Sequence, residues 1–246
     1  MLTPSSLPAV DTQPLPAPEG LPLGLDSLTG RTFDAVLFDM DGTLIDSGPV
    51  VVRSWFRWAQ EEGVDPALLA GKHGIPSAQI VAELLAGASA ERRSAAIRRI
   101  DDIEVADTDG IVVLPGAREA LSALPAGRVA IATSCTRPLA AARIGATGLP
   151  APAVVVTASD VERGKPDPAP YLLAAQRLGV DPARCLVVED APAGIAAGRA
   201  AGCATLAVAS THRVEDLVAA RADAVVVDLS GVLLEGDDDG VRLQPA

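Results

Sequence analysis

From residue 33 onward, short apolar runs alternate with segments long enough to form helices. Runs of this length, rich in Val, Ile, Leu and Ala, are typical of strands that are buried on both faces of a sheet. The runs lie at residues 34–38, 128–132, 153–156, 185–188, 204–208 and 224–227. Because strands that are joined through helices run parallel, the alternation predicts an α/β fold, a doubly wound parallel sheet of the Rossmann-like kind.

Two of the intervening segments carry signals for where a helix begins and ends. Residues 168–178 and 192–201 each begin with Pro, which fits the first turn of a helix. Each is followed by a glycine, Gly179 or Gly202, which favours a helix end. These signals support helices between the predicted strands.

One long segment, residues 48–110, interrupts the alternation and carries helical patterns only. Its apolar residues form stripes at Val51, Val52, Trp55, Phe56 and Ala59, and at Ile80, Val81, Leu84 and Leu85. A further helix is predicted at 90–103. We expect a small helical cap domain that excludes water and selects the substrate. Extra helices packed on the sheet without that role are the alternative.

The two ends of the chain differ in composition from the rest. Residues 1–30 are rich in Pro, Leu and Ser and lack the basic start or apolar stretch of a secretion signal or a membrane span. We expect a disordered extension there. Residues 231–246 are interpreted as a solvated acidic tail rather than a calcium loop. The predicted catalytic core then comprises residues 31–47 and 111–230.

Composition and charge narrow the class of partner. The formal net charge of -12 disfavours nucleic acid and anionic membrane surfaces, so an anionic substrate needs local positive groups. The chain contains three cysteines, an odd number without metal-ligand spacing, which is typical of reduced thiols in a cytoplasmic protein. We expect a cytoplasmic monomer that binds a small molecule.

The first apolar run is followed at once by two carboxylates, Asp39 and Asp41, and then by Gly42. In an extended segment, side chains two residues apart point the same way, so the pair could share a hard cation or a reacting group. Ligands of open α/β sheets bind at the carboxyl ends of strands, where this pair falls. Taken alone, the pair is also compatible with a solvated turn.

Other strand ends also carry polar groups. The second run ends in Thr133 and Ser134, whose hydroxyl and backbone N–H groups suit a phosphate but also suit a helix cap. Lys165, one of two lysines in the chain, lies between glycine and proline residues that fix the backbone, although an exposed turn would look the same. The fourth run ends in Glu189 and Asp190, which suit a cation site or an N-cap.

Together these groups resemble the motifs of the haloacid dehalogenase superfamily, in particular its phosphatase branch with a helical cap after the first motif. Residues 39–43, Asp-Met-Asp-Gly-Thr, are similar to the first motif, Thr133 to the second, and Lys165 to the third. Glu189 and Asp190 are similar to the fourth. The resemblance covers residues 33–228 and keeps the order of the motifs.

The resemblance implies a role for each acid. Asp39 would be the nucleophile that forms an aspartyl-phosphate, and Asp41 the general acid and then the general base. Magnesium would be bound by the Asp39 carboxylate, the Asp41 main-chain carbonyl and Asp190, with Glu189 in a supporting contact.

The resemblance also implies how the phosphate is held. Thr133, the N–H of Ser134 and Lys165 would bind its oxygens and neutralise the charge that develops on them. Such local groups would allow a phosphate dianion to enter an acidic protein.

Within the superfamily, Asp41 favours phosphoryl transfer, because the dehalogenases lack this second acid. Val51 stands where phosphomutases similar to β-phosphoglucomutase carry a histidine, so we favour hydrolysis. A phosphomutase and a non-catalytic regulatory protein that keeps the fold are the alternatives.

The substrate class rests on the predicted cap. Lys72, His73 and the glycine that follows are similar to a His-Gly in glycerol-phosphate and sugar-phosphate phosphatases. These two residues are therefore candidate substrate contacts, although an ordinary loop role for His73 stays open. The expected substrate is a small phosphorylated sugar or polyol. Tyr171 and His212 receive no predicted role.

Overall fold

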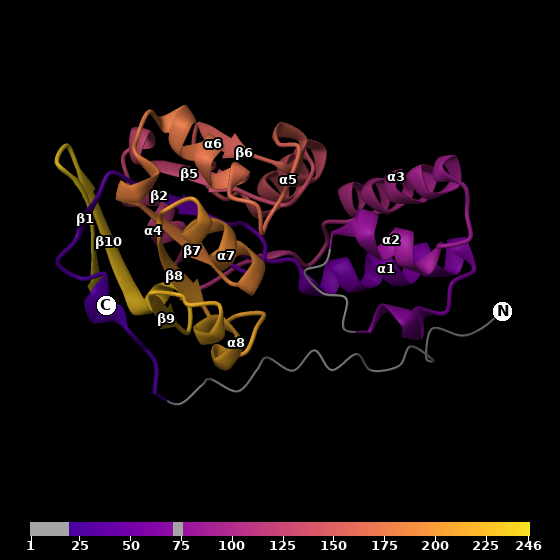
Figure 1. Cartoon of the computed structure of the whole chain (residues 1–246), viewed down its shortest axis with the longest axis horizontal. Coiled ribbons are helices and arrows are strands. Elements are labelled where there is room, and N and C mark those ends of the chain that lie inside the picture. Colours follow the sequence, from indigo (N-terminus) through magenta and orange to yellow (C-terminus); the bar gives the residue numbers. More distant parts are fainter. Residues whose placement is uncertain (1–19, 71–75) are drawn as a thin grey trace.

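A six-stranded parallel sheet forms the middle of the larger part of the molecule, with the strand order β6-β5-β2-β7-β8-β9 (Figure 1). The structure, a computed structural model, describes residues 20–70 and 76–246. The strands are β2 (Ala35–Phe38), β5 (Val129–Ala132), β6 (Val154–Val156), β7 (Cys185–Glu189), β8 (Ala204–Val208) and β9 (Ala224–Val226). All six apolar runs therefore form strands of one sheet, and the predicted fold class is confirmed.

Helices cover both faces of this sheet because side chains alternate along each strand. Val36 and Phe38 belong to a buried cluster that includes side chains of α4 and α5, whereas Ala35 and Leu37 belong to one that includes side chains of α6 and α7. The helices of this part are α4 (Ala117–Ser122), α5 (Arg137–Thr147), α6 (Ala169–Leu178), α7 (Pro192–Ala200) and α8 (Val214–Ala219). Apolar side chains on both faces explain why the strands read as continuous apolar runs.

The helical segment lies to one side of the sheet (Figure 1). It contains α1 (Gly48–Glu62), a 3₁₀ helix (Pro66–Leu69), α2 (Ser77–Leu84) and α3 (Ala90–Ala106). The chain enters it through β3 (Ile45–Asp46) and leaves through β4 (Val112–Val113), which pair antiparallel. The two crossings therefore lie side by side.

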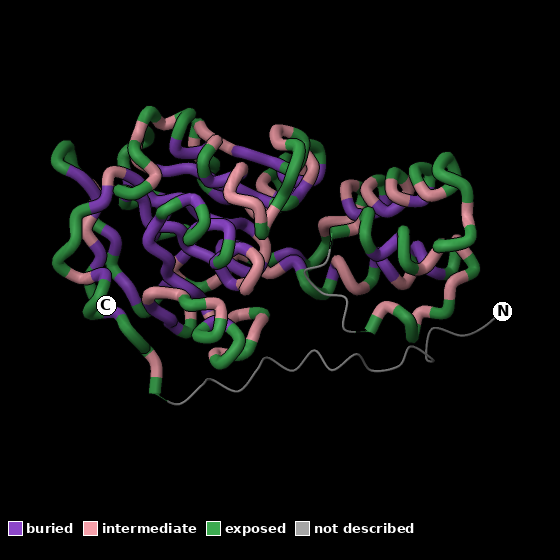
Figure 2. Tube along the Cα trace, in the orientation of Figure 1, coloured by how far each residue is buried: buried purple, intermediate pink, exposed green. Residues whose placement is uncertain are grey.

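The helical segment has a hydrophobic core of its own (Figure 2). Trp55, Trp58 and Ala59 of α1 pack there with Ile80 of α2 and Ile100 of α3. The indole N–H of Trp58 donates to the main-chain oxygen of Ala96 at 2.9 Å, which satisfies its one polar group. A separate core supports the hypothesis of a cap domain.

Two terminal segments differ from the expectation. Within residues 20–30, the part of the predicted extension that the structure describes, Leu25 and Leu28 are buried, and Leu23 pairs with Val225 of β9. The predicted tail instead forms a hairpin of β10 (Val232–Asp237) and β11 (Gly240–Pro245), and β11 also pairs with β1 (Thr32–Phe33). Alternate apolar side chains of the hairpin are buried, and its acidic residues occupy the exposed positions and the turn.

Candidate active site

Three of the predicted site residues converge because their strands are neighbours. β2 pairs with β5 on one side and with β7 on the other, so their carboxyl ends meet at one edge of the sheet. The Asp39 N–H donates to the main-chain oxygen of Val188 at 2.9 Å, and the Thr133 N–H donates to that of Val156 at 2.9 Å. The backbone thus stays extended for one residue beyond each strand and fixes where these side chains begin.

Lys165 reaches this edge from the loop before α6 and joins two carboxylates. Its Nζ lies 2.5 Å from Oδ1 of Asp39 and 2.6 Å from Oε1 of Glu189. The hydroxyl of Tyr171, in α6, donates to the same Oε1 at 2.7 Å. Burial works to lower the pKa of Lys165, but the charges of Asp39 and Glu189 raise it overall, so the ammonium stays charged.

The other oxygen of Glu189 is held by the backbone. Its Oε2 accepts hydrogen bonds from the N–H groups of Asp190 and Ala191, at 3.1 and 3.2 Å. This carboxylate lies against Gly194 of α7, where a Cβ would come within 1.8 Å of it. Glycine at this position leaves the space that the carboxylate occupies.

Asp190 is held in a similar way by residues of two loops. Its Oδ2 accepts a hydrogen bond from Thr211, in the loop after β8, and its Oδ1 accepts one from Thr43 at 3.5 Å. Gly42 has a φ of 86° and approaches so closely that a Cβ would lie 2.3 Å from Oδ2 of Asp190. Ser210 donates to the main-chain oxygen of Gly42, which ties the same loop to the end of β2.

The carboxylates of Asp39, Glu189 and Asp190 form a cluster that suits a hard cation. Among the residues that the structure describes, each of these three offers an oxygen, and the oxygens lie within 4.8 Å of one another. Burial raises the pKa of Asp39 well above its ordinary value, against the charge of Lys165 and with the help of the other two acids. Burial and the charge of Glu189 raise the pKa of Asp190 to about 7. Three buried carboxylates beside one ammonium leave excess negative charge that a divalent cation would neutralise.

The Asp41 carboxylate takes part in a different set of contacts. Its Oδ1 accepts hydrogen bonds from Ser47 and from the guanidinium of Arg143, both at 2.7 Å, and its Oδ2 lies 3.0 Å from Sγ of Cys135. Arg143 also faces Glu104 of α3 at 3.4 Å. The two acids of the first motif therefore have separate surroundings, which fits separate duties.

The remaining predicted site residues fall in three places. Thr133 is buried, and its hydroxyl oxygen accepts a hydrogen bond from the N–H of Cys135 at 3.1 Å. Ser134 is exposed at the sheet edge. Lys72 and His73 lie outside the described residues.

Sequence reasoning missed several residues that hold this site. Tyr171 and Thr211 carry no local signal, because each contacts its carboxylate across a long separation in the chain. Arg143 does carry one, since it follows Leu139 and Ala140 at helical spacing on the buried face of α5. An arginine on an apolar stripe indicates a buried partner.

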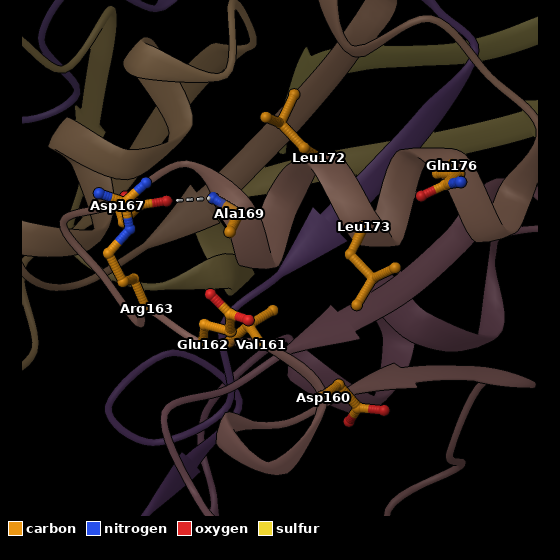
Figure 3. A pocket seen from close by; sticks show the side chains of 9 residues that line it. All are labelled: Asp160, Val161, Glu162, Arg163, Asp167, Ala169, Leu172, Leu173 and Gln176. Atoms are coloured by element: carbon orange, nitrogen blue, oxygen red, sulfur yellow. Dashed lines mark hydrogen bonds and ion pairs between the residues drawn. The ribbon is translucent and has the colours of Figure 1, made fainter.

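A pocket beside the Lys165 loop has different chemistry (Figure 3). It is lined by residues 160–163, by Asp167 and by residues of α6. Asp167 accepts a hydrogen bond from the N–H of Ala169 at 3.0 Å and pairs with Arg163 at 3.0 Å, and Asp160 pairs with Arg137 and Arg177. These acids are already neutralised, so the carboxylate cluster is the better candidate for chemistry.

The doubly wound sheet brings buried acids and one lysine to the carboxyl ends of neighbouring strands, which is where enzymes with open α/β sheets bind their ligands. Residues 33–202 match the model of the haloacid dehalogenase-like hydrolases, and the chain belongs to this family. The resemblance inferred from the motifs is confirmed.

Several proteins similar in sequence to this chain are named as phosphatases. The chain is 47% identical over 187 residues to hexitol phosphatase A of Escherichia coli, covering 74% of this chain and 87% of that protein. It is 34% identical over 216 residues to glycerol-1-phosphate phosphohydrolase 2 of Saccharomyces cerevisiae, covering 82% and 85%. A crystal structure of a hydrolase from Pseudomonas syringae superposes with a TM-score of 0.71 at 27% identity, covering 80% of this chain and 94% of that one.

Proposed function

We propose that this protein is a magnesium-dependent phosphatase that hydrolyses small phosphorylated sugars or polyols through an aspartyl-phosphate at Asp39. The observation that carries the proposal is the buried cluster of Asp39, Lys165, Glu189 and Asp190 at the carboxyl edge of the sheet. The names of the relatives support phosphate monoesters of hexitols, glycerol or similar alcohols as the substrate class.

The metal would be held by the carboxylates of Asp39 and Asp190 and by the main-chain carbonyl of Asp41, with Glu189 in a supporting contact. The oxygen-only donor set and the excess negative charge fit magnesium. A bound magnesium ion would neutralise charge on the carboxylates and on the phosphate and would act as a Lewis acid. Thr211 and Thr43 would hold the Asp190 carboxylate toward it.

In the first step, a carboxylate oxygen of Asp39 attacks phosphorus, and the bond from phosphorus to the alcohol oxygen breaks. Asp41 gives its proton to the leaving alcohol. The charge of Lys165 works against the rise that burial causes in the pKa of Asp39, and with Thr133 and the N–H of Ser134 Lys165 would bind the phosphate oxygens.

In the second step, water attacks the phosphorus of the aspartyl-phosphate and releases the Asp39 carboxylate with inorganic phosphate. Asp41 is now ionised and takes the proton from that water, which restores it for the next cycle. The helical segment, residues 48–110, would act as a cap that excludes bulk water while the intermediate exists. Lys72 and His73 are proposed to contact the substrate from this segment.

The cellular location and the oligomeric state are also part of the proposal. The three cysteines are free and buried, which supports a reducing, cytoplasmic location. Within residues 20–70 and 76–246, no helix is long and apolar enough to cross a membrane. We propose a monomer in solution, and size-exclusion chromatography with light scattering would test this.

Phosphate release by the purified protein tests the proposal. We expect release from hexitol, glycerol and aryl phosphates with magnesium and none with a chelator, and we expect Asp39→Asn to abolish it. Asp102→Asn is the matched control, because it makes the same change on the exposed side of α3. Full activity of Asp39→Asn would overturn the mechanism. Sugar-phosphate isomerisation that needs a bisphosphate activator would identify a mutase instead, and no turnover on any phosphate would favour a regulatory role.

A further inference from the structure

Arg143 occupies a position where a charged side chain is costly. It lies on α5 with a side-chain exposure of 4%, on the same face as Leu139 and Ala140, which pack in the core. Removing a guanidinium from water is unfavourable unless nearby groups compensate for the lost hydration. The contacts of Arg143 should therefore reveal why it is buried.

Those contacts join two parts of the molecule. The Nη1 nitrogen of Arg143 donates to Oδ1 of Asp41 at 2.7 Å and lies 3.2 Å from Sγ of Cys135. Its Nη2 nitrogen faces Oε1 of Glu104 at 3.4 Å. Glu104 is buried near the end of α3, which contacts α5 where the helical segment meets the sheet (Figure 1). The guanidinium therefore links Asp41 to the helical segment.

The same contacts fix the orientation of the Asp41 carboxylate. Oδ1 receives donors from two directions, Arg143 and Ser47, and Oδ2 faces Cys135. Ser47 comes just before α1, so the first crossing of the chain into the helical segment borders this carboxylate. A carboxylate held on both oxygens has little freedom to rotate.

The contacts of the buried Arg143 guanidinium with the described residues do not satisfy all of its hydrogen-bond donors, so they are poorly suited to a role in stability alone. Within the part of the chain that the structure describes, no group accepts a hydrogen bond from the buried Nε of Arg143. A buried donor without a partner costs about 1–3 kcal/mol. A structural arginine would gain more from a position where all its donors are satisfied.

We propose that Arg143 is a positioning residue for Asp41, and that Glu104 of α3 holds Arg143 in place. The inference rests on the proposed function, in which Asp41 protonates the leaving alcohol. The helical segment thereby contributes to the orientation of the acid through a buried ion pair as well as by covering the site. Without Arg143, the Asp41 carboxylate would rotate away from the leaving oxygen, and the step that needs its proton would slow.

The dependence of kcat/KM on the leaving group isolates this effect. This ratio reports the reaction up to the first irreversible step, which includes departure of the alcohol. An alkyl alcohol needs a proton to leave, whereas p-nitrophenolate leaves without one. For Arg143→Met we expect kcat/KM to fall at least about tenfold more with glycerol phosphate than with p-nitrophenyl phosphate, because general acid catalysis contributes about 10²–10⁴ in rate.

Three further variants sharpen the test. Arg143→Lys keeps the positive charge but loses the guanidinium group whose two terminal nitrogens contact Asp41 and Glu104. We therefore expect a partial loss of kcat/KM with the same dependence on the leaving group. Glu104→Gln should show a smaller loss of the same kind. The matched control is Arg99→Met, which removes the ion pair of Arg99 in α3 with Glu61 in α1 and leaves the contacts of Asp41 untouched, and we expect it to match the wild type with both substrates.

Circular dichroism establishes that each variant is folded, and Arg143→Lys and Glu104→Gln carry the test if Arg143→Met does not fold. Equal losses with both substrates, or no loss, would overturn the inference while phosphate release by the wild type still supported the proposed function. A wild type that hydrolyses no phosphate ester would instead overturn the proposed function itself.

Discussion

Replacing Gly194 by alanine tests how tightly the site is built around Glu189. A Cβ at this position would lie 1.8 Å from Cδ and Oε1 of Glu189 and 2.3 Å from Oε2, whereas carbon atoms in contact are about 3.5–4.0 Å apart. The carboxylate must therefore move. It is buried, with 1% exposure, so it has nowhere to go without losing its contacts.

The size of the effect follows from those contacts. Movement would weaken hydrogen bonds from Lys165, from Tyr171 and from the N–H groups of Asp190 and Ala191. Hydrogen bonds to a charged group contribute about 1.5–3 kcal/mol each, and alanine returns up to about 1 kcal/mol of helix propensity. If the displaced carboxylate loses two of its four bonds, the free energy of unfolding falls by about 2–5 kcal/mol.

Gly145→Ala is the matched control. Gly145 also lies inside a helix, α5, but nothing lies within 4 Å of a Cβ there. Helix propensity alone predicts a gain of up to about 1 kcal/mol. Urea denaturation followed by circular dichroism measures both variants. A Gly194→Ala protein as stable as Gly145→Ala would refute the reasoning, because it would mean that the Glu189 carboxylate is free to move.

Three further predictions concern the fold and the metal. Leu28→Ala should lower the free energy of unfolding by about 2–4 kcal/mol, because this side chain is fully buried, and wild-type stability would contradict its place in the core. Thr211→Val should weaken magnesium binding about tenfold in titration calorimetry through loss of the hydrogen bond to Asp190, and unchanged affinity would exclude this support. Magnesium should raise the melting temperature more at about pH 8 than at about pH 5.5. The pKa values of Asp39 and Asp190 are raised in the folded protein, so protonation of these two acids stabilises the fold. This stabilisation is fully present below about pH 4. The part that Asp190 contributes is lost as the pH rises through about 7. Magnesium binds the ionised forms and would offset that loss, so an equal shift at both pH values would contradict the assignment.

The central sheet and the convergence of Asp39, Thr133 and Glu189 could be predicted from the sequence. Asp39 and Thr133 directly follow strands that are buried on both faces, and Glu189 is the last residue of another such strand. Strands of this kind read as continuous apolar runs. Parallel strands point their carboxyl ends to one edge, so residues that are far apart in the chain become neighbours there. The roles of these residues came from the family resemblance and stay predictions.

The supporting contacts could not be predicted in the same way. Tyr171, Arg143 and Thr211 reach the site from helices and loops whose relative placement depends on packing of the whole chain. The C-terminal hairpin was missed because its exposed acidic positions suggested a tail. Its buried positions, such as Val232 and Leu234, alternate as in a strand with one face in water.

Trapping the phosphoryl group on Asp39 would distinguish a covalent intermediate from direct attack by water on the substrate. In Asp41→Asn the acid and base function is removed, so an aryl phosphate should still transfer its phosphoryl group while attack by water slows. We expect a burst of the aryl alcohol and, after an acid quench, a phosphoryl adduct that peptide mass spectrometry assigns to Asp39. A burst with the adduct on another residue, or with no adduct on the protein, would contradict this prediction.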